Sequence, residues 1–436
     1  MKMNIFDNEE ISYKDLMNEL NKIIISQKII KSVKKSFSFT DEPKFFQFYS
    51  ELIKKFNKGD SGSCLSINEN KAKIKAIAET IERYSLGEFK KKDLIKTSYN
   101  KDKRCVDPSL FLSFSEKQIG EDIKIYKKKL REFLFYWTEG YSLFDHKKIL
   151  IPTQLVYVPY YMDKEVLLRH PISTGAAFGS SLAGALYRGI CEVVERDAFM
   201  ITYLNKLKAP RIDLENIQNK QINSYLTWFK KYFLELYVFD ITTDIKIPTV
   251  LCIILDKSGV GPALSFGAKA DINYIDAVIG AIEEAQNSRV WIRYLKVKRK
   301  NIKNIKEINE PEDRAIYWYG LKRINNFDFL LKNKKTKIDF KKFKRINKTR
   351  QKLKEVLKIL KKNKKNIFFV NLTPKEIKKY GFKVVKAIIP KMQPLYLYED
   401  FKYLGEARLY NIPVILGYRK VPEKESKLNK VPHPFV

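Results

Sequence analysis

The sequence has few of the residues that build disulfide frameworks and histidine-based metal sites. Its 436 residues include four cysteines and three histidines, and no two cysteines form a CxxC pair. Thiols spaced this widely exclude a disulfide framework and a Cys-based zinc site, and the scattered histidines argue against a His-rich metal centre. No Ser-His-Asp or Cys-His arrangement is recognisable. The residues concerned are Cys64, Cys105, Cys191, Cys252, His146, His170 and His433.

Long hydrophobic runs are absent as well. The longest, Ile247 to Leu255, is about half of the roughly 18 residues that a membrane span needs. Residues 1–10 lack the apolar core of a signal peptide. We therefore expect a cytoplasmic protein with no membrane partner. A hydrophobic content of 44% is ample for a large buried core.

Acidic residues are scarce relative to basic ones, and the formal net charge is +34. Between Trp291 and Val370 there are 27 basic and 7 acidic residues, so this region holds more than half of the excess. It is the only support for a nucleic-acid-binding hypothesis, in which Lys and Arg release counterions from phosphates. The region is also rich in Ile and Asn, which together with Lys are the residues that an AT-biased genome encodes most readily. We therefore favour solvated faces and expect no nucleic-acid partner, although a basic surface could hold an acidic partner or leader peptide.

Hydrophobic periodicity predicts an N-terminal helical extension over residues 1–60. The extension has two amphipathic helical patterns, over 11–26 and 44–56. Alternation and turn signals predict a hairpin over 137–159, with His146 exposed in its turn, and two strands over 235–241 and 248–254. A further helix is predicted over 271–293. Strands and long helices in alternation indicate an α/β fold with mixed sheets.

The most informative stretch is 171–200, where a turn rich in small residues runs into a long helix. Apolar residues recur there at helical spacing, and Ser180 or Ser181 suits the N-cap position. Glu192 and Glu195 lie three residues apart, so both carboxylates project from one edge of the helix and could share a hard cation. Taken alone, the pattern is also typical of a solvated helix edge.

A second helical pattern, over residues 70–84, repeats this device. Each helix carries E-x-x-E-R, so two carboxylates are followed directly by an arginine in both. Four carboxylates from two helices suit one or two Mg²⁺ ions, which prefer oxygen ligands and substrate phosphates, and ATP is the obvious phosphate donor. The predicted Mg²⁺ ligands, which would also hold ATP, are Glu79, Glu82, Glu192 and Glu195.

The segments AIAETIERY (76–84) and STGAAFGSSLAGALYRGICEVVERDAFM (173–200) resemble the two signature segments of the YcaO family. The resemblance continues in 204–214, 281–289, 370–395 and 432–436. It therefore implies a catalytic domain over roughly residues 61–436. Members of this family use ATP and Mg²⁺ to phosphorylate a peptide amide oxygen. The resemblance implies a YcaO-type fold, in which mixed sheets and long helices enclose the ATP and Mg²⁺ site.

The resemblance also implies roles for residues outside the Glu pairs. Arg196 and Arg289 would bind the phosphoryl oxygens, and Glu284 would belong to the ATP site. The family has a glutamine near this point. Alignment by eye allows Asn287 in its place, or instead Glu283 with Gln286, and a single sequence leaves this open.

The turn before the central helix resembles the ATP loop of the family at Ser173, Thr174 and Gly175. We expect residues 175–179 to form a loop at a helix N-terminus, where backbone N–H groups favour an anion. The loop has no Walker A pattern, since it contains no G-K-S or G-K-T. The residues of the expected loop are Gly175, Ala176, Ala177 and Gly179.

The carboxyl terminus reads Pro-His-Pro-Phe-Val, and its two prolines hold the segment extended. A free tail on the surface is the plain alternative, because termini are often disordered. The azoline-forming cyclodehydratases that this subgroup resembles end in P-x-P-x-P tails that reach the active site, although here the last proline is replaced by valine. We hypothesise that the terminal carboxylate or His433 moves protons during ring closure. The expected tail residues of the site are Pro432, His433, Pro434 and Val436.

The resemblance implies a substrate and a partner protein. The substrate would be a ribosomal precursor peptide whose Cys, Ser or Thr becomes a thiazoline or oxazoline, as in bacteriocin biosynthesis. The partner would be a separate ThiF-like protein that binds the leader of the precursor, because about sixty residues before the family-like region are too few for such a domain. Peptide thioamidation by external sulfide and a non-catalytic peptide-binding scaffold are the alternatives. The choice between Cys and Ser/Thr and the oligomeric state, a homodimer included, stay open.

Overall fold

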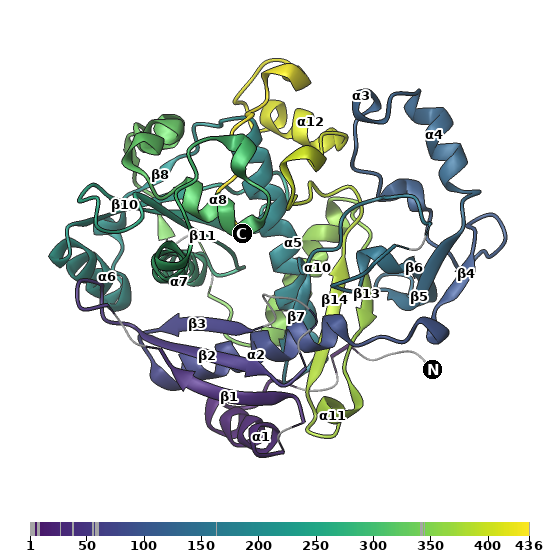
Figure 1. Ribbon diagram of the computed structural model, residues 1–436, viewed down its shortest axis with the longest axis horizontal. Coiled ribbons are helices and arrows are strands. Elements are labelled where there is room, and N and C mark those ends of the chain that lie inside the picture. Colours follow the sequence, from purple (N-terminus) through teal and green to yellow (C-terminus); the bar gives the residue numbers. More distant parts are fainter. Residues whose placement is uncertain are drawn as a thin grey trace.

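The computed structural model describes residues 5–6, 9–26, 28–36, 39–54, 56, 61–162, 164–340, 343 and 345–435, and in this part of the chain the strands form three sheets. Figure 1 shows the two larger sheets on either side of a central helix, α5 (Leu182–Leu204), with a small N-terminal sheet below them. The expected α/β fold with mixed sheets and long helices is confirmed.

The small sheet has the order β1 (Ile30–Lys35), β2 (Phe46–Leu52) and β3 (Gly62–Ser66), with antiparallel pairing throughout. Helix α1 (Tyr13–Ile25) confirms the pattern over 11–26. The helix predicted over 44–56 is wrong, because most of this range is β2. Its aromatic residues favour a pleated strand once β1 and β3 pair on both sides. The pairing of β2 with β3 also carries the sheet across residue 60, the boundary expected for the catalytic domain.

The second sheet has the order β4 (Ile95–Thr97), β5 (Phe135–Ser142), β13 (Phe368–Asn371), β14 (Lys383–Ile388) and β7 (Ala176–Gly179), and β6 (Lys148–Pro152) pairs with β5. The β5–β6 pair confirms the predicted hairpin, and His146 lies exposed in its turn. The loop predicted over residues 175–179 is wrong, because Ala176 to Gly179 form a buried strand. The small residues serve close packing there: a Cβ on Gly179 would lie 2.6 Å from the amide nitrogen of Ala185.

The third sheet has the order β11 (Leu264–Ala270), β10 (Thr249–Asp256), β9 (Leu234–Asp240), β8 (Arg211–Ile212) and β12 (Lys335–Thr336). The antiparallel β9–β10 pair confirms the two strands predicted over 235–241 and 248–254. Every residue of β10 is buried, because helices cover the sheet. One of them is α7 (Tyr274–Lys298), which confirms the pattern over 271–293.

Three long helices connect the sheets. Helix α5 contacts β7 and β14 of the second sheet and β11 of the third, and Ser181 is its N-cap, accepting a hydrogen bond from the amide of Gly184. Helix α2 (Glu69–Gly87) lies against β3 and β7, and α7 reaches from β11 to β3. The two helices with E-x-x-E-R and the third predicted helix therefore face one region of the molecule.

Shorter elements surround this frame. They are α3 (Glu116–Ile119), α4 (Ile123–Leu130), α6 (Lys220–Lys231), α8 (Pro311–Tyr317), α9 (Asp328–Leu331), α10 (Thr349–Lys362), α11 (Lys375–Lys378) and α12 (Ala407–Ile415). All four cysteines carry free thiols, as expected. In the ranges that the structure describes, no helix combines the length and apolar character that crossing a membrane would require.

Candidate functional site

A row of five glutamates runs across α2, α5 and α7 and forms the centre of the site. Each member acts electrostatically on the next: Glu79 and Glu192 both raise the pKa of Glu82, and Glu195 raises the pKa values of Glu192 and Glu284. The two E-x-x-E-R motifs therefore face each other. The residues of this carboxylate row are Glu79, Glu82, Glu192, Glu195 and Glu284.

Backbone amides of three strands hold four of these carboxylates in place. The donors are the amide groups of Ser63 to Glu79 (3.0 Å), Phe178 to Glu82 (2.8 Å), Ala270 to Glu195 (3.1 Å) and Ala268 to Glu284 (3.0 Å). The carboxylate of Glu192 has no hydrogen-bond partner among the described residues. Four acidic groups are thus oriented by the sheets, and the fifth is free to bind a ligand.

The carboxylate row is poorly compensated for its negative charge. Burial, together with Glu192 and Glu79, raises the pKa of Glu82 to about 8. Burial, together with Glu195, raises the pKa of Glu284 to about 7, and the same two causes raise that of Glu192. Carboxyl groups shift in this direction when desolvation and like charge outweigh nearby cations. A bound cation would relieve the imbalance.

Two arginines contact the row: Arg83 donates to Glu79 at 3.0 Å, and Arg196 contacts two further carboxylates. One terminal nitrogen of Arg196 lies 3.4 Å from a carboxylate oxygen of Glu195 and 3.6 Å from one of Glu284. Lys269 of β11 and Lys386 of β14 also lower the pKa of Glu192 through their charge. Sequence reasoning missed both lysines. The signal for Lys386 was present, since it is the single cation in the apolar run VVKAII.

The carboxylates of the row are ligands that suit Mg²⁺, but the row does not supply a full set of protein ligands for the ion. Among the described residues, no three acidic, histidine or cysteine side chains come close enough together to hold a metal ion by themselves. The backbone anchors explain this spacing, because they distribute the four carboxylates over three strands. Mg²⁺ is usually held by one or two carboxylates, with waters and substrate phosphates completing the octahedron. The under-compensated charge and the free carboxylate of Glu192 suit that arrangement, and the roles of Glu79, Glu82, Glu192 and Glu195 as ligands stay predictions.

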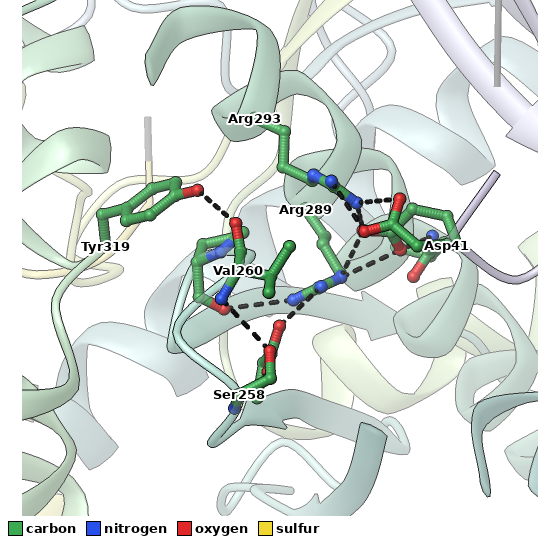
Figure 2. Close-up of polar contacts among 10 residues, drawn as sticks. Asp41, Ser258, Val260, Arg289, Arg293 and Tyr319 are labelled. Atoms are coloured by element: carbon green, nitrogen blue, oxygen red, sulfur yellow. Dashed lines mark hydrogen bonds and ion pairs between the residues drawn. The ribbon is translucent and has the colours of Figure 1, made fainter. Parts of the chain in front are cut away.

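Arg289 lies in a separate buried network, which Figure 2 shows. Its Nε donates to both carboxylate oxygens of Glu42 (2.8 and 2.9 Å), and its terminal nitrogens donate to Asp256 (2.7 Å) and the carbonyl of Pro262 (3.1 Å). Glu42 also accepts from Arg293 at 2.6 Å. Binding of phosphoryl oxygens by Arg289 stays a prediction, and Glu42 is a partner that no sequence pattern indicated.

The two candidate amides of α7 have different surroundings. Gln286 is fully buried and donates to Glu42 at 3.0 Å, so it belongs to the Arg289 network. Asn287 donates to the carbonyl of Ser63 at 3.1 Å, and the amide of Ser63 holds Glu79. Asn287 is therefore the amide that is linked to the carboxylate row.

The turn at Ser173, Thr174 and Gly175 precedes β7, where Thr174 lines a small cavity together with Arg196. Gly175 has a φ of +89°, and a Cβ there would lie 2.2 Å from the carbonyl oxygen of Ala387. Only glycine fits such a turn packed against β14. Contact of this turn with ATP stays a prediction.

The C-terminal segment, residues 432–435, is buried, so the free-tail alternative does not hold for it. Tyr203 donates to the carbonyl of Pro432 (2.8 Å), and Arg314 donates to the carbonyl of Phe435 (3.0 Å). The Phe435 ring lies under the guanidinium of Arg196, 4.8 Å from its central carbon. Val436, also expected in the site, lies outside the described residues.

His433 is fully buried in the C-terminal segment. Its Nε2 lies 2.6 Å from the carbonyl oxygen of Tyr396 and must donate, because a carbonyl only accepts. Burial holds its pKa well below the usual range, so the ring is neutral. Its ring proton is held in the hydrogen bond to the Tyr396 carbonyl. The described contacts therefore give His433 a role in fixing the C-terminal segment, and a role in proton transfer stays a hypothesis.

Residues 66–393 match the family model described as YcaO cyclodehydratase, ATP- and Mg²⁺-binding. The match spans more than half of the chain, and the chain belongs to the YcaO family. ATP and Mg²⁺, the cofactors expected from the Glu pairs, are those of this family.

Two curated relatives are described as uncharacterized proteins. One, from Methanothermobacter thermautotrophicus, is 24% identical over 258 residues, which are 56% of this chain and 64% of that protein. The other, from the tfuA 3′ region of Rhizobium leguminosarum bv. trifolii, is 30% identical over 122 residues, or 27% of this chain and 29% of that protein.

Solved structures share the fold. A heterocyclase in complex with substrate and cofactor has a TM-score of 0.82 at 20% identity, covering 98% of this chain and 58% of that chain. The heterocyclase TruD has a TM-score of 0.65 at 21% identity, covering 84% and 51%. The YcaO protein from Methanopyrus kandleri bound with AMPPCP and Mg²⁺ has a TM-score of 0.64 at 13% identity, covering 97% and 96%. The chain spans less than two thirds of both heterocyclases and both curated relatives.

Proposed function

We propose that this YcaO protein is an ATP- and Mg²⁺-dependent peptide cyclodehydratase that forms thiazolines or oxazolines in a ribosomal precursor peptide. The observation that carries the proposal is the burial of the C-terminal segment against Arg196, which itself contacts Glu195 and Glu284 of the carboxylate row. A tail in this place adjoins the carboxylate row, where Mg·ATP would bind. This supports the cyclodehydratase subgroup over the thioamidation subgroup, whose members often lack the tail.

The peptide chemistry is a ring closure with loss of the backbone oxygen. The S–H or O–H group of Cys, Ser or Thr adds to the preceding carbonyl carbon, a C–S or C–O bond forms, and its proton passes to a base. The former carbonyl oxygen takes the γ-phosphoryl group and then leaves as phosphate, while the amide nitrogen loses its proton, and a C=N bond forms within the ring that the C–S or C–O bond has closed. Mg·ATP, when bound, supplies the phosphoryl group that makes this oxygen a leaving group.

Different residues of the site would have different roles in this reaction. Glu79, Glu82, Glu192 and Glu195 would hold Mg²⁺ and, through it, the phosphates. Arg196 would stabilise negative charge that develops on the transferred group, since its guanidinium is already fixed between carboxylates and the Phe435 ring. Phe435 would shield this side of Arg196 from water, which strengthens its electrostatic action.

The test is a mass measurement on a peptide with Cys and Ser residues, incubated with the chain, Mg·ATP and the partner protein. The proposal expects a loss of one water per ring, dependent on both ATP and Mg²⁺. Consumption of ATP with peptide mass unchanged would contradict it.

We further propose a ThiF-like partner that presents the leader of the precursor, and we leave a homodimer open. The microcin synthetase McbBCD of E. coli, which shares the fold with a TM-score of 0.54, is a complex of several proteins, and a related structure has pro-MccB17 bound. Full ring formation by the chain alone, without any partner, would contradict this part of the proposal.

Peptide thioamidation is the second candidate function. It is favoured by the relative from the tfuA 3′ region, because a TfuA-like neighbour is expected of thioamidation and not of azoline formation. The two reactions differ in mass: sulfide replaces oxygen in a thioamide, whereas azoline formation removes water. The same incubation with sulfide added distinguishes them.

A further inference from the structure

A cavity of about 50 Å³ lies between α5, β14 and the segment before β7, next to the carboxylate row. Three cationic side chains line it, and no described residue in its lining is acidic. A cavity needs roughly 10–15 Å³ for each water, so this one has room for a few waters or one small anion. The three cations of this cation-lined cavity are Arg169, Arg196 and Lys386.

All three cations lack full compensation. Arg169 and Arg196 each have a buried Nε with no hydrogen-bond partner among the described residues. Lys386 is 2% exposed and donates one hydrogen bond, to the carbonyl of Ile172 at 2.5 Å, out of the three that an ammonium group offers. A buried charge without hydrogen-bond partners is costly in free energy. The cavity therefore favours binding of a group that accepts hydrogen bonds from these three side chains.

The neighbouring acidic side chains compensate only part of the positive charge of these three cations. Glu192 acts electrostatically on Lys386 and Arg196, and Glu406 acts on Arg169. Burial raises the pKa of Glu406 to about 7, so it carries a partial charge at neutral pH. Burial also lowers the pKa of Lys386 to about 7 in spite of Glu192. An anion in the cavity would compensate the remaining positive charge and accept the unused hydrogen bonds.

We propose that the cation-lined cavity binds inorganic phosphate at a site separate from the carboxylate row. Two guanidinium groups and an ammonium group are the donors that tetrahedral phosphate oxygens accept best. Gln393 also lines the cavity, and its buried Oε1 has no donor among the described residues, so a monohydrogen phosphate has an acceptor for its proton. The cavity and the carboxylate row share Arg196, which places this site where phosphate could be held after the reaction. Only the origin of the phosphate rests on the proposed function.

The test is calorimetric titration of the full chain with inorganic phosphate at about pH 6.5, where Lys386 is charged, and in about 0.15 M salt, which screens surface sites. We expect saturable binding by the unaltered chain and at least tenfold weaker binding by Lys386→Met and Arg169→Gln. The matched control is Lys383→Met, a change of another lysine of β14 that does not line the cavity, and it should bind phosphate normally. Lys386→Met removes a buried charge, so we expect it to fold with an unchanged or higher melting temperature.

A parallel titration with a non-hydrolysable Mg·nucleotide separates the two sites. Arg169→Gln, whose side chain lies outside the carboxylate row, should keep nucleotide affinity within about threefold of the unaltered chain. Absence of saturable phosphate binding, or equal binding by the cavity variants and the control, would overturn the proposal, and so would joint loss of phosphate and nucleotide binding by Arg169→Gln. Because no peptide is present, failure of ring formation in the earlier test leaves this result intact.

Discussion

The ring of Phe435 lies beneath the guanidinium of Arg196, with 4.8 Å between the ring centre and the central guanidinium carbon. The arginine belongs to the second E-x-x-E-R motif on α5, and the phenylalanine is the last described residue of the chain. The C-terminal segment, residues 432–435, is thereby packed against the charged centre of the molecule. Substitutions in the C-terminal segment should therefore change the rate of ring formation.

Replacing Phe435 by alanine should lower the rate of ring formation at least tenfold while Mg·ATP affinity stays within about threefold. A cation–π contact contributes about 0.5–2 kcal/mol, and its loss also opens Arg196 to water. Steady-state kinetics and nucleotide titration measure the two effects. Phe233→Ala, at a phenylalanine that is 87% exposed, is the control. Normal ring formation by Phe435→Ala would show that the tail is a bystander.

The local features of this arrangement follow from sequence patterns. The two Glu helices, the Ser181 cap, the β5–β6 hairpin and the β9–β10 pair all lie where periodicity and turn signals predict them. These signals act within about ten residues, which is the range over which helix and hairpin periodicity is set.

Features that depend on distant partners were missed. Residues 46–52 have a helical pattern but form β2, because β1 and β3 pair with them. Glu42 reaches Arg289 across 247 residues. A place for the C-terminal segment beside the site was expected only through the family resemblance, and Phe435, which contacts Arg196, was not among the expected residues. No local signal marks such contacts. The lysine of VVKAII was the exception, since a single cation in a buried strand indicates a functional or paired charge.

Exchange of Glu195 or Glu79 for glutamine should weaken Mg·ATP binding at least tenfold. Each change removes one charge from the carboxylate row, and the amide oxygen can still accept the backbone hydrogen bond from Ala270 or Ser63. Folding stability should therefore stay within about 1 kcal/mol. Calorimetric titration with a non-hydrolysable nucleotide checks this, with Glu139→Gln on exposed β5 surface as the control. Undiminished affinity in both variants would remove the metal-site assignment.

Glu82 should make stability depend on pH. Its pKa is about 8 in the folded protein, against 4.5 for an unperturbed glutamate. The folded chain therefore keeps a proton that the unfolded chain has lost between these values. This contribution to stability is fully present below pH 4.5 and disappears as the pH rises through about 8.

Glu82→Gln mimics the protonated form and so should stabilise the nucleotide-free protein at about pH 9, by roughly 1–3 kcal/mol, and change it by less than about 1 kcal/mol at about pH 5. Thermal or denaturant unfolding at the two pH values measures the difference. Glu88→Gln, at the end of the same helix, should show no such gain. An equal effect of Glu82→Gln at both pH values would refute the assignment.

The Arg289 network should be a major source of stability. Glu42 is buried and accepts from Arg289, Arg293 and Gln286. Glu42→Gln therefore removes the buried carboxylate that both arginines share, leaving Arg289 with Asp256 and Arg293 with Asp41. We expect a loss of about 3–5 kcal/mol. Asp41→Asn is the matched control, because Asp41 is 49% exposed and its carboxylate accepts hydrogen bonds from Arg293, as Figure 2 shows. This change should cost less than about 1 kcal/mol. Similar losses for the two variants in denaturant unfolding would contradict this account.

The central claim is that the chain transfers a phosphoryl group to a backbone amide oxygen. It is tested most directly with a precursor peptide whose reacting carbonyl carries heavy oxygen, incubated with the chain, the partner protein and Mg·ATP, followed by mass analysis of the released phosphate. We predict that the label appears in phosphate, with one labelled phosphate for each modified residue. Modified peptide accompanied by unlabelled phosphate, with the heavy oxygen recovered in water or retained in the peptide, would contradict the claim.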